Sequence, residues 1–241
     1  MTLSHERYLE AIEKESAALT EAARGNLDAH VPTCPAWNMS DLLGHLGEVQ
    51  RFWGEMAERA LEDPDAAQNH DPPDGVDLVE WFEESTGNLL GSLDGSDLDR
   101  PMWSWSRVKT VSFVPRRMAQ ETAMHRWDAQ NAVGDPADID GDLAVDGIDE
   151  FLFVWLLATA PLEDPPGSSV HIHTTDVAGE WLAVLDEEPV VTREHAKGDA
   201  ALRGPASDVL LYLWGRIAPS TLEIHGDPAT LDQFRSVFDL E

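Results

Sequence analysis

A glutamate and a histidine stand four residues apart in the sequence, at Glu121 and His125. On a helix, residues four apart share a face, so these two side chains can converge on one point. A carboxylate and an imidazole can then fill two coordination positions of a divalent metal. His45, inside the apolar stretch 42–46, is the best-placed third ligand. Three protein ligands with one open position are typical of a catalytic zinc site, and nickel or iron is an alternative.

The spacing also has a simpler interpretation. A glutamate and a histidine occur four apart by chance in many helices, and a histidine on an apolar helix face is more often a core residue than a ligand. His171 and His173, two apart in an alternating stretch, would lie on one side of a strand. They too could bind metal, although solvent-facing or interface histidines are the simpler interpretation.

Two acidic residues could assist a metal site. Asp128 follows His125 by three residues and could accept the second N–H of that imidazole. A surface ion pair with Arg126 would explain Asp128 equally well. Glu48, one turn after His45, is a candidate general base, as is Asp128.

Arginines are scarce in this chain, so their positions are informative. Arg117 lies close to the metal pair and could position an anionic substrate. Arg216 could be a helix C-terminal charge, which the helix dipole favours. It could instead bind a carboxylate, because a guanidinium holds such groups through two hydrogen bonds.

The overall charge excludes some partners. The chain has 46 acidic and 16 basic residues and a net charge of −30, which disfavours binding to nucleic acids and anionic membranes. The acidic residues are spread along the chain, which indicates a solvated acidic surface and suggests adaptation to high salt. No apolar run is long enough to span a membrane and the N-terminus has no secretory signal, so we expect a cytoplasmic protein.

The positions of the apolar residues predict the elements that hold these side chains. The first part has helical periodicity and should form an antiparallel four-helix bundle. A fifth helix, at 146–157, should pack on it. Four helices are predicted in the bundle. The first covers 6–23, the second runs from an N-cap at Ser40 to about 56, the third covers 76–93, and the fourth begins near 115 and ends before 134.

The second part alternates with period two and predicts a small α+β domain. A proline-rich stretch at 161–167 is the natural boundary, so the sequence predicts domains at 1–160 and 161–241. The predicted strands are 170–175, 181–185, 189–193, 199–203 and 221–225, with helices at 205–216 and 228–238.

Several of these segments together resemble the mycothiol-dependent maleylpyruvate isomerase family. The similar segments are 31–37, 41–46, 116–117, 121–128 and 146–152 in the first part, and 171–176, 204–208 and 213–216 in the second. The resemblance implies a DinB-like metal-binding helical bundle followed by a sterol-carrier-like α+β domain. It also implies that His45, Glu121 and His125 occupy the family's zinc-ligand positions and that Arg216 matches its assisting arginine.

The resemblance further implies a thiol cosubstrate. In the isomerase the metal activates mycothiol, and a coordinated thiol loses its proton because the cation stabilises the thiolate. We therefore expect a metalloenzyme that uses mycothiol or another small thiol, as an isomerase or thiol transferase on a small anionic substrate. The alternatives are a metal-dependent hydrolase and a non-catalytic metal-binding or regulatory module. Both a monomer and a homodimer are compatible with the sequence.

Overall fold

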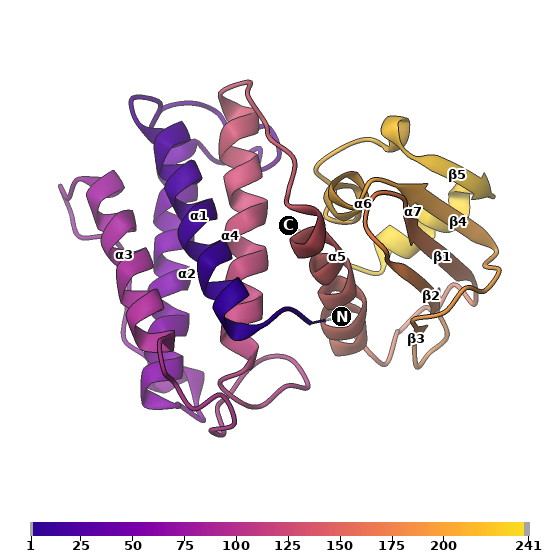
Figure 1. Cartoon of the computed structure of the whole chain (residues 1–241), viewed down its shortest axis with the longest axis horizontal. Coiled ribbons are helices and arrows are strands. Elements are labelled where there is room, and N and C mark those ends of the chain that lie inside the picture. Colours follow the sequence, from indigo (N-terminus) through magenta and orange to yellow (C-terminus); the bar gives the residue numbers. More distant parts are fainter. Residues whose placement is uncertain (1, 239–241) are drawn as a thin grey trace. The chain divides into compact units, whose positions relative to one another are not determined.

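A computed structural model of the chain describes residues 2–238. It consists of two compact units, one from Leu3 to Ala137 and one from Asp138 onward (Figure 1). We call them the helical unit and the sheet unit. Each is described by itself below, and together they confirm the predicted combination of a four-helix bundle with a small α+β domain.

The helical unit is built from four long helices. Helices α1 and α2 each pack against both α3 and α4 (Figure 1). The interior of the unit is therefore lined by all four helices, and α4 is buried along most of its length. The helices are α1 His5–Ala23, α2 Met39–Arg59, α3 Leu78–Leu93 and α4 Phe113–Ala132, with a short 3-10 turn, η1, at Pro64–Ala66.

Side-chain caps explain where the helices begin. Helix α2 starts with a reciprocal capping box, in which Asn38 accepts from the backbone N–H of Asp41 at 3.0 Å and Asp41 accepts from that of Asn38 at 2.9 Å. The prediction of Ser40 as the N-cap is therefore wrong. Ser40 instead donates its hydroxyl to the carbonyl of Leu27 at 3.1 Å. Asp77 caps α3 by accepting from two backbone N–H groups.

A buried hydrogen-bond network crosses the helical unit. The amide nitrogen of Gln50, fully buried on α2, reaches the hydroxyls of Ser16 at 3.2 Å and Thr122 at 3.3 Å. Its amide oxygen accepts from Thr86 at 2.8 Å. One residue thus connects all four helices, and buried polar groups of this kind favour one arrangement of the bundle because each is satisfied only there.

The sheet unit contains one five-stranded sheet in the order β3-β2-β1-β4-β5. Strands β1 and β4 are parallel, and the other neighbouring pairs are antiparallel. Helix α7 packs on β1 and β4, and α6 contacts β4 (Figure 1). The strands are β1 Ser169–Thr174, β2 Glu180–Val184, β3 Val190–Thr192, β4 Ala200–Gly204 and β5 Glu223–Gly226, and the helices are α6 Ala206–Leu213 and α7 Pro228–Ser236, with a 3-10 turn, η3, at Pro219–Thr221.

Helix α5, Gly141–Glu150, belongs to the sheet unit. It continues as a π-helical segment, η2, at Phe151–Leu156, and α5 packs against α6. Asp149 on α5 accepts from the indole N–H of Trp181 at 3.0 Å and from Arg193 at 2.6 and 2.8 Å. These contacts assign the fifth helix to the sheet unit, and the prediction that it belongs with the bundle is wrong. The compact units divide between Ala137 and Asp138, before this helix and not after it at residue 160.

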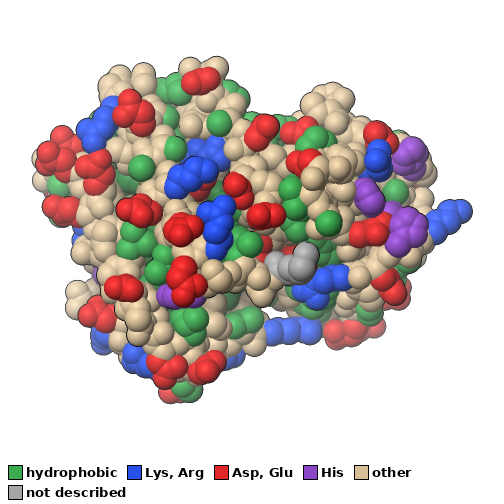
Figure 2. Space-filling model, viewed as in Figure 1, with side chains coloured by type: hydrophobic (Ala, Val, Ile, Leu, Met, Phe, Trp, Pro, Cys, Tyr) green, Lys and Arg blue, Asp and Glu red, His purple; other side chains and the backbone are tan. Residues whose placement is uncertain are grey.

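The surface of the protein is acidic, as the composition predicts. Acidic side chains are scattered over both units on the face shown in Figure 2, among fewer basic ones. None of the helices within residues 2–238 combines the length and the hydropathy that a membrane crossing needs.

Candidate metal centre

The three predicted metal ligands converge inside the helical unit. His45 comes from α2, and Glu121 and His125 lie one turn apart on α4. Oε1 of Glu121 is 3.2 Å from Nε2 of His125 and 3.6 Å from Nε2 of His45. All three potential ligand atoms lie within 4.8 Å of one another. The chain therefore brings these side chains, separated by up to 80 residues, to one point.

The separations fit a divalent transition metal. Zinc holds imidazole nitrogens and carboxylate oxygens at about 2.0–2.2 Å, so two ligand atoms of a tetrahedral ion are about 3.4 Å apart. The two measured separations, 3.2 and 3.6 Å, bracket that value. Two imidazoles and one carboxylate are also donor types that zinc, nickel and iron accept. The residues present thus fit such an ion and leave one position for a further ligand.

The electrostatics of the cluster suit a cation. Burial by itself would raise the pKa of Glu121, but hydrogen bonds with His125 and His45 and the charge of Arg117 hold that pKa well below its usual range. Burial would likewise lower the pKa of His125, yet hydrogen bonds with Asp128 and Glu121 raise it to about 9. Glu121 is therefore an anion at neutral pH. A metal that binds here takes the place of the proton between Glu121 and His125.

Asp128 orients the ring of His125. It is fully buried, and its Oδ2 lies 3.0 Å from Nδ1 of His125. Its other oxygen accepts from the hydroxyl of Thr33 at 2.6 Å. With Nδ1 held in this way, Nε2 faces Glu121, which is the arrangement found around metal-binding histidines. Sequence reasoning suggested Asp128 but missed Thr33, which lies 95 residues earlier and has no spacing relationship to it.

Arg117 lies beside the cluster but is already engaged. Its Nη2 is 3.1 Å from Oε2 of Glu121, one helical turn later, and its side chain is only 4% exposed. It therefore neutralises the carboxylate oxygen that faces away from the two histidines. This contact weighs against a role for Arg117 as a cation that holds substrate.

An aromatic ring lies against both imidazoles. The ring of Trp37 is 4.8 Å from that of His45 and 6.2 Å from that of His125, measured between centroids. A tight turn positions it, because the backbone N–H of Trp37 donates to the carbonyl of Cys34 at 2.8 Å and its carbonyl accepts from Val31 at 3.0 Å. The position of Trp37 beside two ligands depends on this turn.

Polar anchors hold the ligand-bearing helix. Arg126, buried on α4, donates to Glu15 on α1 at 2.5 Å, to Gln130 at 2.9 Å and to the carbonyl of Ala137 at 2.5 Å. The sequence allowed a surface ion pair between Arg126 and Asp128, but both side chains are buried, and Arg126 pairs with Glu15. These contacts fix α4 against α1 and so set the position of Glu121 and His125.

Two predicted site residues lie elsewhere. Glu48 is exposed on α2, and no hydrogen bond or ion pair joins it to the three ligands among residues 2–238. Arg216 belongs to the sheet unit, beyond the end of α6, where its Nη1 donates to the carbonyl of Trp214 at 2.9 Å. Its role toward a substrate stays a prediction.

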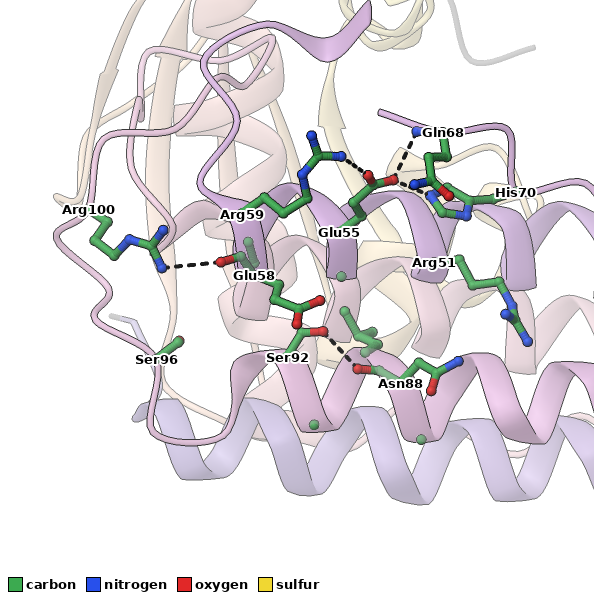
Figure 3. A pocket seen from close by; sticks show the side chains of 15 residues that line it. Arg51, Glu55, Glu58, Arg59, Gln68, His70, Asn88, Ser92, Ser96 and Arg100 are labelled. Atoms are coloured by element: carbon green, nitrogen blue, oxygen red, sulfur yellow. Dashed lines mark hydrogen bonds and ion pairs between the residues drawn. The ribbon is translucent and has the colours of Figure 1, made fainter. Parts of the chain in front are cut away.

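A cavity of about 660 Å³ lies elsewhere in the helical unit, along α2 and α3. Figure 3 shows Glu55 at its wall, bonded to Arg59, Gln68 and His70, and Arg100 bonded to the backbone carbonyl of Glu58. None of the three candidate ligands lines this cavity. The cavity and the candidate metal cluster are thus separate features of the helical unit.

Comparison with known proteins gives consistent matches over both units. Residues 9–130 match the mycothiol maleylpyruvate isomerase N-terminal domain, and residues 142–233 match the C-terminal domain of the same isomerase. The crystal structure of the mycothiol-dependent maleylpyruvate isomerase is similar with a TM-score of 0.61 at 14% identity, over 93% of this chain and 95% of that chain. A histidine-to-alanine mutant of it matches with the same TM-score and coverage at 12% identity. At these identities the likeness shows the fold alone, and no curated protein matches this chain.

Proposed function

Because this chain belongs to the mycothiol maleylpyruvate isomerase family, as its matches to both domains show, we propose that it is a divalent-metal enzyme with a small-thiol cosubstrate of the mycothiol type. The reaction is an isomerisation or a thiol transfer on a small, anionic substrate. The observation that carries the proposal is the convergence of His45, Glu121 and His125 with spacings that suit one ion.

The surrounding residues support a bound cation. Asp128 holds the ring of His125 so that Nε2 faces the centre, and Arg117 engages the oxygen of Glu121 that faces away. Trp37 lies against both imidazoles and limits their contact with water on that side. A divalent metal in such a site supplies Lewis acidity, which stabilises a thiolate and lowers the pKa of a bound thiol.

Hydrolysis is the less favoured reaction. A hydrolase of this type needs a general base close to the bound water. Both oxygens of Asp128 already accept hydrogen bonds, from His125 and Thr33, and Glu48 is exposed. The two residues that sequence reasoning suggested as bases are thus poorly placed for that role.

An anionic substrate needs a cation, because the net charge of −30 repels it. Arg117 is paired with Glu121, which leaves Arg216 as the predicted arginine for this purpose. Its guanidinium would hold a carboxylate through two hydrogen bonds. Arg216→Lys keeps the charge and removes that geometry, so we expect a raised KM in that variant.

The test is turnover of maleylpyruvate by zinc-loaded protein, with and without mycothiol. We expect turnover only with the thiol, its loss in His45→Gln, and its retention in Glu58→Gln, an exposed residue of the same helix. Circular dichroism verifies that each variant is folded. Thiol-independent turnover would contradict the proposal, and cleavage products in place of an isomer would support hydrolysis. Full turnover by His45→Gln would contradict the metal site.

A further inference from the structure

A second group of histidines lies in the sheet unit. His171 and His173 alternate along β1 with the buried residues Val170 and Ile172, so both histidines face the side of the sheet opposite to that core. Figure 2 shows histidine side chains gathered over the strands of this unit, with acidic side chains next to them. Neither histidine belongs to the metal centre described above.

The sheet register brings a carboxylate to these histidines. Glu180, the first residue of β2, pairs directly with His173 across the antiparallel ladder. Oε1 of Glu180 is 2.9 Å from Nε2 of His171 and 3.0 Å from Nδ1 of His173. Beyond the end of β3, His195 places its Nδ1 2.5 Å from the same oxygen.

The convergence on one atom is unusual for a plain hydrogen-bond network. All three described contacts of Glu180 reach Oε1, although a carboxylate offers about four lone-pair positions over its two oxygens. One carboxylate oxygen offers about two of these positions, so three contacts exceed what hydrogen bonding to Oε1 alone uses well. Imidazole nitrogens gathered beside one carboxylate oxygen are instead the donor types of a transition-metal site.

We propose that His171, His173 and Glu180 form a second divalent-metal site, of the zinc type, and that the exposed ring of His195 turns toward the ion to become its fourth ligand. The potential ligand atoms of the first three lie within 4.8 Å of one another, as they do in the helical unit. Three neutral imidazoles and one carboxylate give the ion a net charge of about +1, which this acidic chain tolerates.

The site has a route for an ion to enter. His173 and Glu180 line a cavity of about 610 Å³ in the sheet unit, together with Thr174 and Arg193. The side chain of His195 is 81% exposed, whereas that of His171 is only 12% exposed. The first three ligands are thus held by the strands, and His195 can close the site once the ion has entered.

Four protein ligands define a structural site and not a catalytic one. The ion would join β1, β2 and the segment that follows β3, a strand of only three residues at the edge of the sheet. We therefore expect the metal to stabilise this edge and to take no part in thiol chemistry. The proposal is independent of the proposed function, since the two sites share no residue.

The test is the zinc content of the full-length protein, stripped with a chelator and then equilibrated at low free zinc. We expect two zinc ions per chain in the wild type and in His225→Gln, an exposed histidine of β5 that lies outside the cluster. Glu180→Gln should retain one zinc, Glu121→Gln should retain one, and the double variant none. Glu180→Gln keeps the size of the side chain, which limits damage to the sheet.

The outcomes separate the two sites. Unchanged zinc content in Glu180→Gln would overturn the second site, and unchanged content in Glu121→Gln would overturn the first. The melting temperature with and without zinc is a second measurement, which also applies to variants that fold poorly. An ion that binds only the native state raises this temperature. Zinc should raise that of Glu121→Gln protein and not that of the double variant. A rise of equal size in both would also overturn the second site.

Discussion

Nδ1 of His125 lies 3.0 Å from Oδ2 of Asp128, three residues later on the same helix. The aspartate is fully buried and makes its second contact with Thr33. A buried carboxylate with this geometry fixes the ring of the histidine and increases the basicity of the nitrogen on its other side. That other nitrogen, Nε2, faces Glu121 and lies 3.2 Å from its Oε1.

Asp128→Asn should weaken zinc binding at this centre by about 10–100-fold, the usual cost of losing such a partner. Isothermal titration of the Glu180→Gln background, which lacks the second site, measures this change alone. Thr33→Val is the matched control, because it removes the 2.6 Å hydrogen bond to Asp128 and leaves the contact with His125. We expect a smaller loss there. Equal zinc affinity with and without Asp128→Asn in this background would contradict the supporting role of Asp128.

Gly47→Ala should lower the free energy of unfolding by about 1–3 kcal/mol, the usual cost of overpacking. A Cβ atom at Gly47 would lie 2.1 Å from the ring of Trp81, so α2 and α3 would have to separate. Gly87→Ala on α3 is the control, since its Cβ meets nothing within 4 Å. It should stabilise the protein by about 0.5–1 kcal/mol, because glycine is a poor helix former. Urea unfolding measures both, and equal effects would contradict the close packing.

Salt should stabilise the protein. The net charge of −30 causes repulsion that a salt solution screens, because the Debye length falls from about 10 Å at 0.1 M to about 3 Å at 1 M. Exposed ion pairs such as Arg24–Glu83 contribute little to the free energy of unfolding, so their screening at high salt costs little stability. The urea midpoint should therefore rise with sodium chloride. A stability that is highest at low salt would contradict adaptation to a salty environment.

Glu55 should contribute stability that acid removes. Burial raises its pKa, but a hydrogen bond from the backbone N–H of Gln68 at 2.9 Å and others from Arg59 and His70 bring the pKa below its ordinary value of 4.5. A lowered pKa in the folded state stabilises above pH 4.5, and this contribution is lost as the pH falls through the folded-state value. The difference in unfolding free energy between wild type and Glu55→Gln should thus shrink below pH 4.5. A difference that is constant from pH 7 to pH 3 would contradict this.

The sequence predicts the elements well where their signals are local. The helix from His5, the fourth helix and all five strands follow from hydrophobic periodicity, and the structure confirms each within a few residues. The N-cap of α2 was placed at Ser40 and lies at Asn38, because two residues near that helix start can both cap and only the geometry of Asp41 decides between them.

Features that depend on contacts between distant residues could not be predicted in the same way. The second histidine cluster needs the register that brings Glu180 opposite His173, and no local spacing contains that information. Helix α5 joins the sheet unit because Asp149 contacts Trp181 and Arg193, far along the chain.

The central claim is that His45, Glu121 and His125 hold one divalent ion. Crystals of zinc-loaded protein, measured on both sides of the zinc absorption edge, test it most directly, because the anomalous signal locates the ion itself. We predict a strong anomalous peak between the two Nε2 atoms and Glu121, within about 2.2 Å of each ligand atom. A fully zinc-loaded crystal with no peak among these three side chains would contradict the claim.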